Sequence, residues 1–181
     1  MKRRAPLRRE RGATLIEVLV TMVIIAFGLL GMAGLQVRMQ VSELESYQRS
    51  QALMLLGDMA NRLAANRNHA SSYVTTTGTG ATCPTSTSTT ADIDIGEWCR
   101  ALQGDNVKKG GASVGAMVGA RGCVAQLSSS EYMVTVAWQG MAPISAPPAS
   151  VTCGANQYDG AQCSGDKCRR VVTTLVRIAT L

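Results

Sequence analysis

The residues best placed for chemistry lie near the start of the chain, where a glycine and a carboxylate flank the beginning of an apolar run. Gly12 follows six basic residues, and the apolar run over residues 13–35 contains a single charged residue, Glu17. An ionised carboxylate is costly in bilayer hydrocarbon, so an acidic residue at that depth indicates a function. The sequence therefore predicts cleavage after Gly12 and pairing of Glu17 with a cation on another chain.

The order of these segments differs from that of a secretory signal peptide, in which the small residue at the cleavage site follows the apolar stretch. Here the small residue comes first, so cleavage after Gly12 would remove only the basic residues 1–12. As a helix, residues 13–35 would reach ~35 Å, which is enough to span a bilayer. The positive-inside rule keeps the arginines cytoplasmic and exports the rest of the chain. An ordinary single-pass anchor is the alternative, but it would need neither Gly12 nor Glu17.

The run RGATLIEVLVTMVIIAFGLLGMAGLQ resembles the class III signal of type IV pilins and the related pseudopilins. In that family a prepilin peptidase cleaves after the glycine and methylates the new amino terminus. The resemblance implies cleavage between Gly12 and Ala13, methylation of Ala13, and an assembly role for Glu17. Ala13 departs from the phenylalanine that is commonest there. The run, with the following Arg38-Met39-Gln40 and the later VTVAWQG, also resembles PilV-type minor pilins, the type IV pilus modification proteins.

The net charge of the whole chain, +6, mostly describes the leader. Without residues 1–12 the chain keeps 12 basic and 11 acidic residues. A nucleic-acid-binding domain needs clustered basic residues, and we expect no nucleic acid as a partner.

Beyond the apolar run, residues 36–68 are amphipathic and free of proline, so they predict the second half of one helix from Ala13 to about Asn66. The expected apolar face recurs at helical spacing and consists of Leu35, Met39, Leu44, Leu53, Leu56, Met59, Ala60 and Leu63.

Three glycines interrupt the apolar half of this helix, at Gly28, Gly31 and Gly34. Each costs roughly 1 kcal/mol of helix stability relative to alanine. They favour either close packing of helices in the membrane or a segment that loosens when the subunit enters a fibre. The resemblance supports the second reading, because many pilins have proline where Gly34 stands.

Residues 69–181 are expected to form an exported head, in which residues 71–92 are rich in serine and threonine and predict an exposed loop. Residues 94–103 predict a short helix with Trp98 as a core anchor. Alternation and β-branched residues predict strands over residues 123–127, 132–138 and 169–180, with a long loop over residues 140–167. The expected fold is therefore α+β and pilin-like, with the long helix packed under an antiparallel sheet of three or more strands.

The six cysteines all follow the apolar run and are expected in an oxidising compartment as disulfides: Cys83, Cys99, Cys123, Cys153, Cys163 and Cys168. Six cysteines allow 15 pairings. Cys83 with Cys99 is our first expectation, together with at least one bridge in the late loop. A zinc site is the alternative, but the chain has no C-x-x-C spacing and no histidine near these cysteines.

The sequence favours a structural protein over an enzyme, with no cofactor and no metal. The only histidine, His69, is expected to face solvent, and the glycines between residues 110 and 119 lack the lysine and Ser/Thr of a phosphate-binding loop.

The resemblance implies a minor pilin that is held in the inner membrane with its head in the periplasm and then enters the pilus fibre. Its partners would be prepilin peptidase, the major pilin and other minor pilins. The alternatives are a minor pseudopilin of a type II secretion system and a pilus-mounted adhesin or DNA-binding module.

Overall fold

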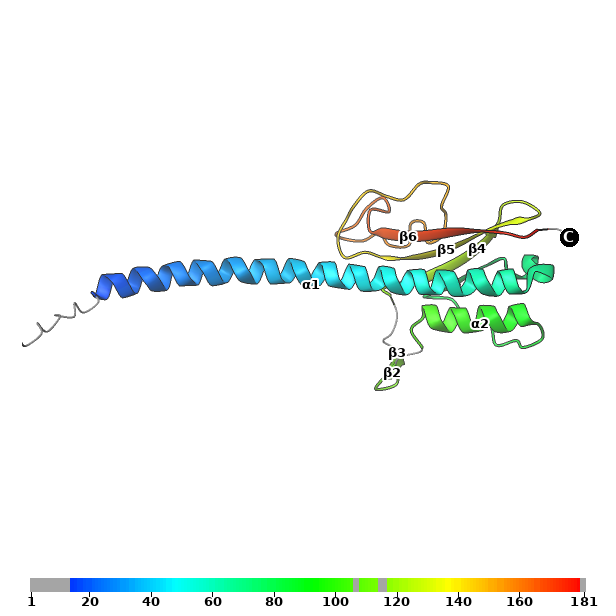
Figure 1. Ribbon diagram of the computed structural model, residues 1–181, viewed down its shortest axis with the longest axis horizontal. Coiled ribbons are helices and arrows are strands. Elements are labelled where there is room, and N and C mark those ends of the chain that lie inside the picture. Colours follow the sequence, from blue (N-terminus) through cyan, green and yellow to red (C-terminus); the bar gives the residue numbers. More distant parts are fainter. Residues whose placement is uncertain (1–13, 106–107, 114–116, 180–181) are drawn as a thin grey trace, which may run out of the picture. The chain divides into compact units, whose positions relative to one another are not determined.

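The structure is a computed structural model that describes residues 14–105, 108–113 and 117–179 (Figure 1). The chain divides into two compact units, Met1–Glu43 and Leu44–Leu181. Helix α1 (Leu15–Ala65) contributes to both units. It ends one residue before the predicted Asn66, and the 3-10 helix η1 (Arg67–Tyr73) follows it. The prediction of one long N-terminal helix is confirmed for the described residues.

The second unit, called the head below, contains a four-stranded antiparallel sheet in the order β1-β4-β5-β6. Its strands are β1 (Thr75–Gly78), β4 (Arg121–Gln126), β5 (Glu131–Gln139) and β6 (Arg169–Arg177), and β2 (Lys108–Lys109) pairs separately with β3 (Ala112–Ser113). In the centre of the sheet Val134 lies opposite both Val124 and Thr174. The predicted α+β fold and its antiparallel sheet are therefore confirmed.

The prediction of an exposed loop over residues 71–92 is wrong for β1. This strand pairs with β4 along its whole length, and Thr77 is buried. Gly78 adopts a φ of +120°, and a Cβ there would lie 2.4 Å from the Ala120 carbonyl oxygen. The pairing uses backbone groups, so three threonines and a glycine can form an edge strand that hydropathy does not reveal.

Helix α2 (Thr90–Leu102) begins four residues before the predicted start at Asp94. Thr89 is its N-cap, because its hydroxyl accepts a hydrogen bond from the Asp92 amide while the Asp92 carboxylate accepts one from the Thr89 amide. This reciprocal pair is a capping box with aspartate in the usual place of glutamate. Figure 1 shows α2 running alongside the part of α1 that belongs to the head.

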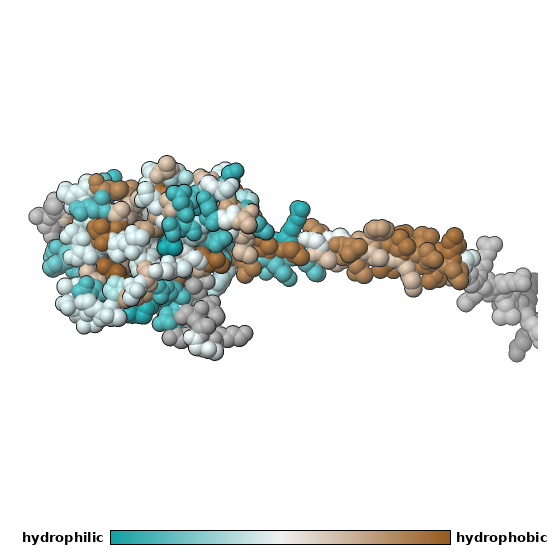
Figure 2. Space-filling view, turned by 180° about the vertical axis from the view of Figure 1, so that it is seen from behind, coloured by the Kyte–Doolittle hydropathy of each residue, from teal (hydrophilic) through white to brown (hydrophobic). Residues whose placement is uncertain are grey.

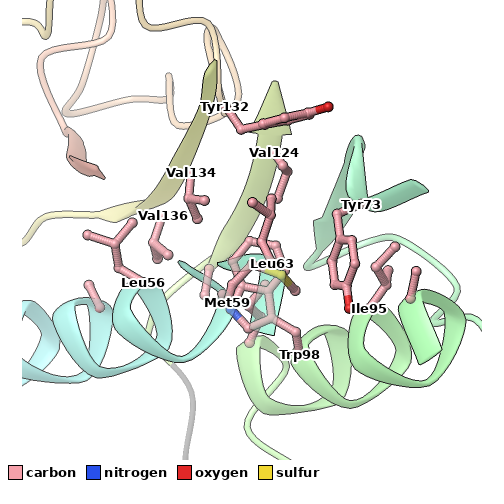
Figure 3. Packing of buried hydrophobic residues seen from close by; sticks show 14 of the residues in the cluster. Leu56, Met59, Leu63, Tyr73, Ile95, Trp98, Val124, Tyr132, Val134 and Val136 are labelled. Atoms are coloured by element: carbon pink, nitrogen blue, oxygen red, sulfur yellow. The ribbon is translucent and has the colours of Figure 1, made fainter. Parts of the chain in front are cut away.

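The core of the head lies where α1 and α2 meet the sheet (Figure 3). Trp98 is fully buried, as predicted, and its indole N–H donates to the Leu55 carbonyl at 2.9 Å. Strand β4 comes so close that a Cβ on Gly122 would lie 2.3 Å from the Trp98 ring. The remaining large side chains of this cluster include Leu56, Met59, Leu63, Val124, Val134 and Val136.

The predicted apolar face of α1 is only partly correct. Leu56, Met59 and Leu63 are buried, whereas Leu44 and Leu53 are about half exposed. Ala52 and Gln48 occupy the buried face instead. Hydropathy favoured leucine over these residues, but the spacing of the helix places Ala52 and Gln48 on the same side as Leu56 and Met59.

Three disulfides hold the head together. Cys83 is joined to Cys99 of α2, which is the pairing expected from the sequence. Cys123 of β4 is joined to Cys153 in the late loop, and Cys163 is joined to Cys168 just before β6. All six sulfurs are therefore in disulfide bonds, and none is available as a thiolate ligand.

Candidate assembly site

The first turn of α1 positions Glu17. The Glu17 amide donates to the Thr14 carbonyl at 3.0 Å, and its nitrogen lies 3.4 Å from the Thr14 hydroxyl oxygen. Thr14 thus caps the helix, and Glu17 sits three residues later, where the helix dipole favours a negative charge. From the sequence we considered Glu17 only for its charge and did not predict Thr14 as the helix cap. The pattern Thr-x-x-Glu before an apolar run is the sequence signal that indicates such a cap.

The Glu17 side chain is exposed and forms no hydrogen bond or ion pair with any residue that the structure describes. The next charged residue along α1 is Arg38, so residues 18–37 are uncharged. Twenty helical residues rise ~30 Å, which matches the hydrocarbon thickness of a bilayer. The carboxylate therefore stands at one end of an uncharged, bilayer-length stretch of helix.

The side chains around this carboxylate form an apolar surface on the first unit (Figure 2). Leu15 is 83% exposed, Phe27 71% and Leu30 69%. The helix is long and apolar enough to cross a membrane. Soluble monomers rarely leave an apolar surface of this extent uncovered, so lipid or other protein must cover it.

Gly28, Gly31 and Gly34 lie within α1, which continues through them without a break. A Cβ at any of the three would meet no heavy atom within 4 Å. Space inside this chain therefore does not require glycine at these positions. Gly12 and Ala13, the predicted cleavage and methylation positions, lie outside the described residues.

A cluster of charged and polar side chains in the head links α1 to α2. The Arg62 guanidinium contacts Asp58 at 3.0 Å, Asp94 at 2.8 Å and Glu97 at 2.7 Å. Partial burial lowers the pKa of Arg62, but hydrogen bonds to these carboxylates outweigh it and raise that pKa above its ordinary value. The Tyr73 hydroxyl donates to Asp94.

Two tyrosines of the head have shifted acidity. Burial raises the pKa of Tyr73 to about 12, and its hydrogen bond to Asp94 adds to the rise. Burial also raises the pKa of Tyr158 to about 12, although the charges of Arg121 and Arg169 act in the opposite direction. The Tyr158 hydroxyl donates to the Gly119 carbonyl at 2.9 Å. Both hydroxyls therefore donate to oxygen atoms within the head, Tyr73 to Asp94 and Tyr158 to the Gly119 carbonyl.

Comparison with protein-family models gives two adjoining matches. Residues 7–33 match the prokaryotic N-terminal methylation motif, and residues 34–104 match a family described as type IV pilin Tt1218. Comparisons with curated proteins and with solved structures found no match.

Three features together define a structural subunit. The apolar helix starts with a capped carboxylate, a methylation motif covers the same residues, and the α+β head is linked by disulfides. Together the two family-model matches support a type IV pilin. This is a family of structural subunits and not of enzymes. The motif implies processing by a prepilin peptidase and assembly with other pilins, and the apolar helix indicates membrane anchoring before assembly.

Proposed function

We propose that the protein is a minor pilin of the PilV type, which helps to start assembly of the type IV pilus. The observation that carries this proposal is the exposed, unpaired Glu17 carboxylate at the end of an uncharged helical stretch. The minor role is supported by the resemblance of the first forty residues and of VTVAWQG, which forms the second half of β5 and the residue after it. Before assembly the chain spans the inner membrane once, with its head in the periplasm.

The proposed mechanism is electrostatic. Prepilin peptidase removes residues 1–12, which releases the basic leader and leaves a cationic amine at Ala13 that is then methylated. Glu17 pairs with the Ala13 amine of a neighbouring pilin. In a low-dielectric helix bundle, leaving either charge unpaired costs several kcal/mol. The pair therefore sets the axial register between neighbouring helices.

The three glycines fit a second step of this mechanism. A helix that moves from lipid into a fibre must adapt to new neighbours, and Gly28, Gly31 and Gly34 weaken it within one short segment. We assign local loosening of α1 during assembly to this segment.

The test is replacement of Glu17 by glutamine in the native host. Glu17→Gln should be cleaved and membrane-bound, but its amount in sheared pili should fall about tenfold or more, because the Ala13 amine then lacks its counter-charge. Glu43→Gln is the matched control, since Glu43 is an exposed glutamate of the same helix beyond the uncharged stretch. Gly12→Val should block cleavage, and its band should not shift on a gel.

Normal incorporation of Glu17→Gln would contradict the pairing mechanism. A deletion strain distinguishes the pseudopilin alternative, since loss of type II secretion with intact twitching motility would assign the chain to that system instead.

A further inference from the structure

The head carries a polar hollow at the end where α1 terminates. It has a volume of about 370 Å³, within the range of small-molecule sites, and lies between η1, the β4–β5 turn and the residues after β6. Its polar lining consists of Arg67, Asn68 and Ser71 from η1, Ser129 from the turn, and Tyr132 from β5. Ile178 adds an apolar wall.

The polar side chains of this hollow are unused within the described part of the chain. Arg67 forms no ion pair or hydrogen bond there, whereas Arg62, Arg169 and Arg170 each bind a carboxylate. The side chains of Asn68, Ser71 and Ser129 likewise have no hydrogen-bond partner among the described residues. Four exposed side chains that can donate hydrogen bonds thus border one hollow without a partner among the described residues.

Tyr132 is the second observation that points to a ligand. Its side chain belongs to the core and the residue is only 3% exposed, yet its hydroxyl has no hydrogen-bond partner among the described residues. Figure 3 shows its ring at the end of the packed side chains, with the hydroxyl at the outer tip. That hydroxyl is not among the sealed, unsatisfied atoms of the head, so it reaches the hollow that Tyr132 lines. The ring is thus held in place by the core, while the hydroxyl remains accessible from the hollow for a ligand.

The lining selects the chemistry of the ligand. A guanidinium binds a carboxylate through two parallel hydrogen bonds, and none of the described residues that line the hollow is acidic. The nearby Glu131 is paired with Arg177 at 2.8 Å. The amide and the hydroxyls match the hydroxyls of a sugar, and Ile178 offers a surface for its C–H face. We propose that the hollow binds an acidic monosaccharide unit, such as a uronic acid residue of a polysaccharide.

The test uses the full-length chain in a detergent without sugar groups, with glucuronate as the probe and glucose as its neutral counterpart. Titration calorimetry should show saturable binding of glucuronate, and binding about tenfold weaker for glucose, because a charge-assisted hydrogen bond contributes more than 1.4 kcal/mol. Arg67→Gln should lower the glucuronate affinity about tenfold, and Tyr132→Phe roughly fivefold. Arg49→Gln, an exposed arginine of α1 outside the hollow, should bind as the parent does.

The proposal is overturned if glucuronate does not saturate, if glucose binds equally well, or if Arg67→Gln binds as tightly as Arg49→Gln. Equal binding of a glutamate-containing dipeptide would reassign the hollow to acidic peptides and overturn the carbohydrate proposal. None of these outcomes bears on Glu17, so the assembly proposal stands or falls separately.

Discussion

Arg62 shows how one side chain can hold two elements of the head together. Its guanidinium reaches Asp58 on its own helix and both Asp94 and Glu97 on α2. The Asp94 side chain is only 14% exposed and also accepts from Tyr73. By contrast, the ion pair between Arg177 and Glu131 lies at the surface, where the Arg177 side chain is 76% exposed. The two arginines thus allow a matched comparison.

We expect Arg62→Ala to lower the free energy of unfolding by about 2 kcal/mol, between the values for exposed and buried ion pairs. The loss arises mainly because the variant leaves the partly buried Asp94 side chain without its arginine partner. Arg177→Ala should change the same quantity by less than about 0.5 kcal/mol. Urea unfolding of the full chain in detergent measures both. Equal losses would show that the Arg62 cluster contributes no more than a surface pair.

At the scale of elements, the sequence predicted what hydropathy and charge encode. It predicted the long helix, β4, β5 and β6 because their apolar residues recur with the period of the element, and it predicted Trp98 in the core. It missed β1, whose pairing depends on backbone groups and on a positive φ at Gly78. The start of α2 was misplaced because a Thr–Asp capping box lies inside a serine- and threonine-rich run.

The candidate assembly site and the polar hollow also include residues that the sequence indicated and residues that it did not. Glu17 was singled out because a charge in an apolar run is conspicuous, and its assembly role stays a prediction. Thr14 was missed because a cap is recognised only with the residue three positions later. The polar hollow could not be predicted, since Arg67, Ser129 and Tyr132 are brought together by the sheet and by the end of α1. Spacing along the chain carries no information about contacts of that range.

The disulfides link elements, and their contributions should follow the length of chain that each one closes. Paired cysteines are separated by 30 residues for Cys123–Cys153, 16 for Cys83–Cys99 and 5 for Cys163–Cys168. Loop-closure entropy predicts losses of roughly 3.5, 3 and 2 kcal/mol when each pair is replaced by alanine. Urea unfolding of the three double variants checks the order. The largest loss at Cys163–Cys168 would instead assign the stability to packing in the late loop.

At the scale of the whole molecule, the two units contain different kinds of groups. In the first unit the described residues include one acid in a long apolar helix, followed only near its end by Arg38 and Glu43. The head contains the disulfides, the sheet and the shifted tyrosines. Changes of pH in the alkaline range should therefore act on the folding of the head through these two tyrosines.

Tyr73 and Tyr158 make this expectation quantitative. Their pKa values are raised from about 10 to about 12 in the folded head, so the folded state retains two protons that the unfolded state releases above pH 10. This contribution to stability is complete below pH 10 and is lost as the pH rises towards 12, by about 1 kcal/mol per pH unit at most for each tyrosine.

The double variant Tyr73→Phe/Tyr158→Phe should be less stable at neutral pH, because Asp94 and the Gly119 carbonyl lose a donor. Its unfolding free energy should nevertheless decline less steeply above pH 10 than that of the parent chain. Short urea titrations from about pH 9 to about pH 11 measure that slope, and parallel slopes for the two proteins would show that neither tyrosine governs the alkaline loss.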